Sequence, residues 1–131
     1  MKKITFIAFV IFSINLSSAQ ATTTYVDDAP YNYEEVDEKP EFPGGIIEFK
    51  NFIAKNLKLN DYEGDSGVLK VSFIIETNGE VSNVAIVVDL GEGSGKEAVR
   101  VVSLSPHWKP GVHRGKIVRV INEIPIRIAG Q

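Results

Sequence analysis

The stretch PEFPGG at residues 40–45 opens the folded part of this 131-residue chain, and a second stretch, PHWKPGVHRGK at residues 106–116, precedes its last predicted strand. Proline fixes φ and glycine permits positive φ, so each stretch predicts a rigid turn of the backbone. Neither contains an obvious nucleophile, general base or cluster of metal ligands. We call residues 40–45 the first corner and residues 106–116 the second corner. Both are predicted to have an architectural role, which favours a binding module over an enzyme. The residues expected to carry that role are Pro43, Gly44, Gly45, Trp108, Pro110 and Gly111.

Trp108 is the only tryptophan of the chain and lies between Pro106 and Pro110. A side chain of this size fits two roles: an apolar plug on the core with its N–H bonded at the rim, or a hot spot at an interface. We favour the plug, because the flanking prolines fix the backbone that carries the indole.

The pattern between the corners predicts a helix and then a hairpin. Apolar residues recur at three- and four-residue steps from Ile46 to Leu57, the spacing of one helix face. The Asn78-Gly79 pair predicts a tight turn between two strands. Leu69, Val71, Phe73 and Ile75 are expected on one face of the first strand, and Val84, Ile86 and Val88 on one face of the second.

A second, short helix and a final strand complete the expected fold. Ser94 and Glu97 match a capping box at the start of that helix, which ends before Pro106. The final strand, at residues 116–128, places Val118, Val120, Ile124, Ile126 and Ile128 on one face, with Asn122 as the polar exception. Arg119, Glu123 and Arg127 occupy the opposite face, so one side of the sheet is covered and the other is wet.

The predicted order is therefore helix, strand, strand, helix, strand. This is an α+β fold with two helices and a three-stranded antiparallel sheet. Pro125 cannot donate a ladder hydrogen bond, so we expect the last strand to lie at an edge of the sheet.

The N-terminal residues resemble a cleavable secretory signal at residues 1–19. Lys2 and Lys3 precede a mostly apolar run, which is too short for a membrane helix of about 20 residues, and small residues follow. Cleavage after Ala19 or after Ala21 fits, and an uncleaved anchor is the alternative. We favour export without a retained membrane anchor. Residues 20–41 are acidic and poor in apolar side chains, which predicts a flexible tail before the folded domain at 42–131.

Composition narrows the class of partner. The chain has no cysteine, which excludes a disulfide framework, a thiolate metal site and a lipid-modified cysteine. Without Lys2 and Lys3, 12 of its 14 basic residues remain against 17 acidic ones, a net charge of −5. That balance argues against nucleic acid and anionic membrane surfaces as partners.

No motif in the sequence favours catalysis, a metal site or a cofactor. The run GEGSGK at residues 91–96 lacks the first glycine of a phosphate loop and the hydroxyl residue after its lysine. His107 and His113, the only histidines, have no further ligand near them in sequence. Asp61, Glu63 and Asp65 alternate as in a calcium loop, but the closing glutamate is missing.

The two corners, in this order and spacing, resemble the C-terminal domain of TonB-family energy transducers, particularly those of Bacteroidetes-type bacteria. The resemblance covers residues 36–128 and includes VDEKPEFPGG at 36–45, Asn78-Gly79, EAVR at 97–100 and the closing IPIRI at 124–128. It implies a periplasmic domain that binds a short segment of outer-membrane, TonB-dependent transporters by adding it to the edge of the last strand. Carried over to this chain, the contacts fall on the backbone of Val118, Arg119, Val120, Ile121, Asn122, Glu123, Ile124 and Ile126.

The expected signal and short acidic tail depart from that family, whose transducers have an uncleaved anchor and a long proline-rich spacer. Our first hypothesis is therefore a soluble periplasmic module that binds a TonB-dependent transporter or another envelope protein through its sheet edge. The second is a self-associating structural domain, a homodimer in the simplest case, whose last strands pair between chains. Catalysis is the least favoured.

Overall fold

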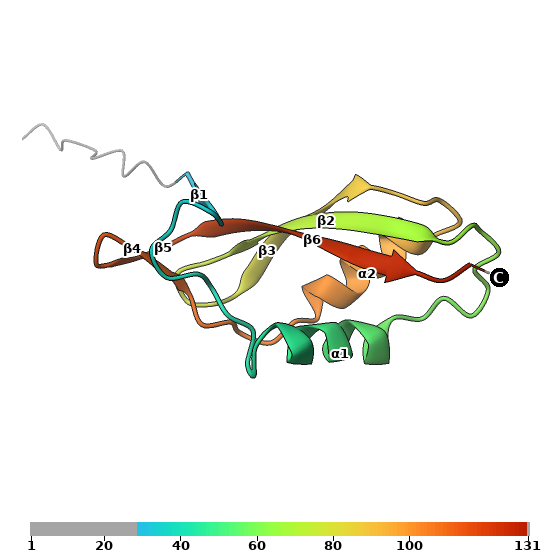
Figure 1. Cartoon of the computed structure of the whole chain (residues 1–131), viewed down its shortest axis with the longest axis horizontal. Coiled ribbons are helices and arrows are strands. Elements are labelled where there is room, and N and C mark those ends of the chain that lie inside the picture. Colours follow the sequence, from blue (N-terminus) through green and yellow to red (C-terminus); the bar gives the residue numbers. More distant parts are fainter. Residues whose placement is uncertain (1–28, 131) are drawn as a thin grey trace, which may run out of the picture.

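The computed structural model describes residues 29–130 and confirms the predicted α+β class (Figure 1). Two helices, α1 (Ile46–Asn56) and α2 (Ser94–Ser103), pack on one face of a four-stranded sheet. The strand order in that sheet is β1-β6-β2-β3. The strands are β1 (Tyr31–Asn32), β2 (Gly67–Ile75), β3 (Val81–Val88) and β6 (Val120–Ile128). A separate hairpin joins β4 (Gly111–His113) and β5 (Lys116–Val118).

The predicted antiparallel core of three strands is present in β6, β2 and β3. β2 is central and pairs along its whole length with β6, from Gly67 opposite Ile128 to Ile75 opposite Val120. Two features depart from the prediction. β1 adds a fourth, parallel strand to β6, so the sheet is mixed. The expected single strand at 116–128 is also split, because its first three residues pair with β4 instead.

Local sequence explains the split. Arg114 and Gly115 both have positive φ, 51° and 74°. Two consecutive residues with positive φ form the turn that best matches the twist of a two-residue hairpin, and His113 pairs with Lys116 across it. The chain therefore folds back on itself before it enters the main sheet.

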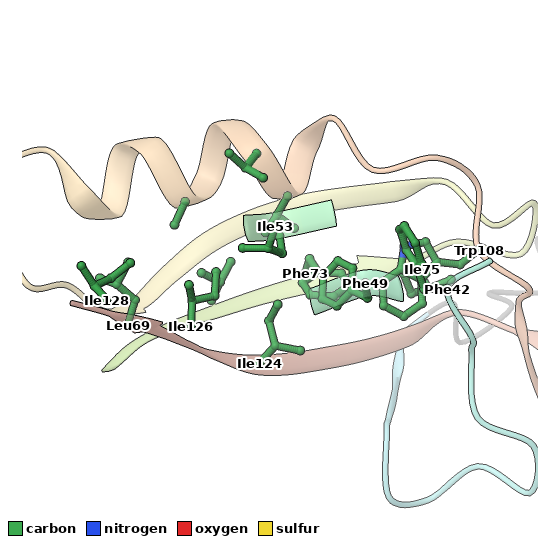
Figure 2. Close-up of a cluster of buried hydrophobic side chains, with 14 of the residues drawn as sticks. Phe42, Phe49, Ile53, Leu69, Phe73, Ile75, Trp108, Ile124, Ile126 and Ile128 are labelled. Carbon is green, nitrogen blue, oxygen red and sulfur yellow. The ribbon is translucent and has the colours of Figure 1, made fainter. Parts of the chain in front are cut away.

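The core lies between the helices and the inner face of the sheet (Figure 2). Leu69, Val71, Phe73 and Ile75 of β2 are fully buried, as their alternation predicts. Phe49 and Ile53 of α1 and Ala98, Val101 and Val102 of α2 cover them. β3 is less regular than expected, because the β2–β3 register shifts twice. Val88 thus pairs with Lys70 and is exposed, so the expectation that it shares one face with Val84 and Ile86 is wrong.

The start of α2 differs from the predicted capping box. Ser94 lies inside the helix, and its hydroxyl donates to the Gly91 carbonyl at 2.6 Å. The Asp89 carboxylate accepts from the amides of Gly91 and Gly95 at 2.9 and 3.2 Å and so takes the capping role. Glu97 instead accepts a hydrogen bond from the Lys58 amide at 2.8 Å and so ties α2 to the end of α1.

The predicted flexible tail is wrong for residues 29–41. Residues 31 and 32 form β1, and the side chain of Val36 is only 4% exposed. Glu38 exchanges two backbone hydrogen bonds with Val112, each 2.9 Å long. Acidic side chains project to solvent from this segment while its backbone is bound to the domain. The rest of the predicted tail and the predicted signal lie outside the described residues.

The two corners meet in space. Glu41 and Lys109 exchange backbone hydrogen bonds of 3.0 and 2.8 Å, so the segment that enters the first corner pairs with the second. In the first corner the Gly45 amide donates to the Phe42 carbonyl at 2.7 Å, closing the turn that leads into α1. In the second, Gly111 is buried, and a Cβ there would lie 2.5 Å from Cγ2 of Val120. The corners therefore fix where β6 begins.

Trp108 lies where the corners and the sheet converge. Its side chain is 6% exposed, and its ring centroid is 4.9 Å from Phe49, 5.6 Å from Phe42 and 5.6 Å from Phe73. The indole Nε1 donates to the Ser105 hydroxyl at 2.7 Å. Trp108 therefore packs as an apolar plug whose polar atom is satisfied at the rim.

Candidate functional site: the outer edge of β6

The outer edge of β6 is closed in its first part and open in its second. The amides of Tyr31 and Tyr33 donate to the carbonyls of Arg119 and Ile121 at 2.9 and 3.1 Å. Backbone groups of alternate residues in a strand point to the same side. The backbone of residues 123, 125 and 127 therefore faces outward as well, and no strand of residues 29–130 pairs with it.

The open part offers both donors and acceptors for a new strand. Glu123 and Arg127 each present an outward amide and carbonyl, while Pro125 presents a carbonyl only. An unpaired row of this kind is a template for strand addition. Pro125 does not weaken the main sheet, because its missing N–H would point away from β2.

An apolar groove of about 420 Å³ runs beside this open edge, between α1 and β6. Ile46, Phe49, Ile53 and Leu57 line its helix side. Ile124 and Ile126 line its strand side, and Figure 2, in which most of α1 is cut away, shows them below Ile53 and Phe49 of that helix. Ile46 is 58% exposed at the start of the helix.

The charged residues that line the groove are both basic. Lys50 comes from α1 and Arg127 from β6, and no carboxylate is among the lining residues. Residues 29–130 together carry 12 basic and 15 acidic side chains, so this groove differs in charge from the average surface.

The sequence-predicted contact residues divide into three groups. Val118 belongs to β5 and pairs with Gly111, so it is not part of the main edge. Arg119, Val120 and Ile121 lie in the part that β1 closes, and Val120 is fully buried. Asn122, Glu123, Ile124 and Ile126 belong to the open part.

The prediction missed Arg127 and the α1 side of the groove. Strand alternation from Glu123 and Pro125 could have identified Arg127 as the next outward-facing backbone. The groove depends on how α1 crosses the sheet, which no local pattern in the sequence reports.

A partly exposed ion pair holds the start of β6. The Arg119 guanidinium donates from Nε and Nη2 to the two oxygens of Glu76, at 2.6 and 3.0 Å, and the Ser82 hydroxyl donates to the same carboxylate at 2.5 Å. The bonds from Arg119 and then from Ser82 lower the pKa of Glu76 below its ordinary value of 4.5. This two-bond ion pair joins Glu76, directly after β2, to Arg119, whose carbonyl accepts a hydrogen bond from the Tyr31 amide of β1.

We expect Glu76→Gln to remove a pH-dependent part of the stability. A lowered pKa in the folded state means that the ionised carboxylate stabilises the fold above pH 4.5, and that this contribution is lost as the pH falls through the folded pKa. The variant should lose about 1–2 kcal/mol of unfolding free energy at pH 7, since the pair is partly exposed. Urea denaturation across pH should show wild type and variant converging at low pH. A gap that stays constant in acid would contradict the assignment.

The two histidines lie in different surroundings. His107 lies against the Asn78 carbonyl at 3.1 Å, whereas His113 lies against the Tyr31 ring, with centroids 4.9 Å apart. Within residues 29–130, no group of three or more histidine or carboxylate side chains could hold a metal ion. None of the helices in that same range is long and apolar enough to cross a membrane.

The fold and its edge define a small α+β domain in which, within residues 29–130, part of the outer edge of β6 is unpaired beside an apolar groove. Residues 59–127 match the family model described as "Gram-negative bacterial TonB protein C-terminal". This is more than half of the chain, so the protein belongs to the TonB C-terminal family, and the resemblance drawn from its sequence is confirmed.

One solved structure is similar, the "NMR solution structure of Helicobacter pylori TonB-CTD (residues 179-285)". Its sequence is 19% identical, the match covers 68% of this chain and 89% of that chain, and the TM-score is 0.40. No curated protein matches the chain.

Proposed function

We propose that this domain is a non-enzymatic periplasmic interaction module that binds an outer-membrane TonB-dependent transporter, or another envelope protein, by strand addition. The proposed site is the open part of β6, from Asn122 to Ile128. Its principal support is the unpaired backbone of Glu123, Pro125 and Arg127 beside the apolar groove under α1. Family membership supports the same class of function.

Strand addition combines two sources of affinity. Main-chain hydrogen bonds to the outward groups of Glu123 and Arg127 supply binding that does not depend on the partner's side chains. Alternate side chains of the added strand point toward α1, where the groove can take apolar groups. Lys50 and Arg127 favour a partner segment that also carries a carboxylate.

The proposed location is the periplasm, reached through the predicted signal at residues 1–19. Cleavage after Ala19 or Ala21 belongs to the same proposal. We also propose that the domain needs no cofactor, because strand addition uses backbone groups and side-chain packing alone.

Site-specific photo-crosslinking in the source bacterium tests this proposal. A photoreactive residue in place of Glu123 or Arg127 should yield an adduct with an outer-membrane transporter, which mass spectrometry can identify. The same residue in place of Val87, which is 51% exposed on the opposite edge strand β3, is the control. Equal adducts from both edges would contradict the proposed site.

A proline pair separates backbone bonding from side-chain effects. Glu123→Pro with Arg127→Pro removes two outward donors, and we expect affinity for the crosslinked transporter to fall about a hundredfold. Glu123→Ala with Arg127→Ala removes the same side chains and keeps both amides, so it should bind much more strongly than the proline pair. Circular dichroism checks that both variants fold. Equal affinities would refute strand addition at this edge.

Self-association is the competing outcome. Two copies could pair through the same part of β6, and light scattering would then report a dimer. A dimer that persists with excess transporter peptide, and that the proline pair dissociates, would replace the proposed function.

A further inference from the structure

β1 occupies the same edge on which the partner is proposed to bind. It covers the backbone of residues 119–121 with a ladder only two residues long. Tyr31 is 39% exposed and Asn32 is exposed too, so neither side chain of the strand belongs to the core. A strand of the chain itself therefore fills part of an edge that continues, unpaired, for several more residues.

The chain turns away from β6 directly after β1. The Glu35 amide donates to the Asn32 carbonyl at 3.0 Å, and the Asn32 amide donates to the Glu35 carboxylate at 3.1 Å. Beyond this turn lies a hollow of about 270 Å³. The turn lines one side of it, and Ile121, Asn122 and Glu123 line the other. Any strand that extends from the open part toward the start of β6 must therefore meet Tyr33.

The segment of residues 29–41 is attached to the domain most firmly after β1. Val36 is buried, and Glu38 and Glu41 are bonded to the second corner through their backbones. Before them, β1 is held by its short ladder and by the contact of the Tyr31 ring with His113. The ring of Tyr33 lies under Lys39 Nζ at 5.1 Å, which is a contact within the segment. β1 can therefore leave β6 without opening the core.

We propose that β1 is a displaceable strand that closes the Arg119–Ile121 part of the edge, and that a partner strand seated on the open part extends by displacing it. This inference rests on the proposed function for the place of the partner. It goes beyond that function, because the accessible length of the site is set by competition between β1 and the partner. The apparent dissociation constant is then the intrinsic one divided by the fraction of molecules in which β1 is released.

Hydrogen exchange of the full chain tests displacement without any partner. The amides of Tyr31 and Tyr33 should exchange at least about a hundredfold faster than those of Ile124 and Ile126, which point toward β2, because a local opening is enough to release them. Equal exchange rates would mean that β1 leaves only when the whole domain unfolds, and would overturn the proposal.

Two sets of variants test the competition. Tyr31→Pro with Tyr33→Pro removes both amide donors to β6. Proline suits position 33, because this is the second residue of the turn from Asn32 to Glu35. Tyr31→Ala with Tyr33→Ala is the matched control, since it removes the rings and keeps the amides. In the opposite direction, Asn32→Cys with Ile121→Cys places a disulfide between paired residues of a chain that has no cysteine.

The probes are synthetic peptides that cover the periplasmic segments of the source organism's TonB-dependent transporters. We expect the proline pair to bind about tenfold more tightly than wild type, and the oxidised cysteine pair at least about tenfold more weakly than the same protein after reduction. Identical affinities in all forms would overturn the displacement and leave the proposed function intact. If no form binds a peptide, the proposed function fails, and hydrogen exchange alone decides whether β1 is displaceable.

Discussion

Replacing Trp108 with alanine is expected to lower the free energy of unfolding by about 3–5 kcal/mol, the usual cost of removing a large buried aromatic side chain. The indole packs against Phe42, Phe49 and Phe73, which come from the first corner, α1 and β2. Its loss leaves a cavity where these elements meet. A small domain has a total stability of about 5–15 kcal/mol, so the variant should lie near the limit of folding.

Trp108→Phe is the matched control, because it keeps an aromatic ring and removes the Nε1 donor to Ser105. It should cost clearly less than the alanine variant. Urea denaturation followed by far-UV circular dichroism measures both without relying on indole fluorescence. If Trp108→Ala lost less than about 1 kcal/mol, which is the scale of a surface substitution, the plug would be wrongly assigned.

Elements with strong local patterns were predictable. β2 and α1 bury one face each, and their apolar residues follow the periods of a strand and a helix. The Asn78-Gly79 turn was predictable because Gly79 must adopt a positive φ, which is 86° here. In each case a few consecutive residues determine the local structure.

The features that the sequence did not reveal have no repeating apolar pattern that would mark them. β1 is too short to have a period, and it is defined by the pairing of Tyr31 with Val120, which lies far from it in the sequence. The role of Asp89 as a cap depends on the path of the loop between it and Gly95. The hairpin that splits the predicted last strand pairs Val112 with Ile117, single apolar residues that form no pattern.

The candidate site was predictable only in part. Pro125 indicated an edge strand, and β6 is open on its outer side from residue 122 onward. The closure of its first residues could not be inferred, because the acidic segment at 29–41 has the composition of a tail. That segment binds mainly through its backbone, and composition says little about backbone pairing.

Gly79→Ala should be about 2–4 kcal/mol more destabilising than Gly115→Ala, because it adds a buried steric clash to a shared backbone strain. Both glycines have positive φ, 86° and 74°, so alanine meets a similar cost of about 1 kcal/mol at each. At Gly115 the new methyl group would meet no atom within 4 Å. At Gly79 it would overlap with the carbonyl oxygen of Trp108.

The clash at Gly79 forces the tight turn away from the second corner. The Trp108 amide donates to the Gly79 carbonyl at 2.8 Å, and this bond must lengthen or break. Because the second corner also pairs with Glu38 and Glu41, the displacement should loosen the segment that carries β1. Thermal or urea denaturation of the two variants gives the difference directly, and hydrogen exchange at Tyr31 and Tyr33 reports the loosening. Equal destabilisation by the two substitutions would show that the turn and the corner do not touch as described.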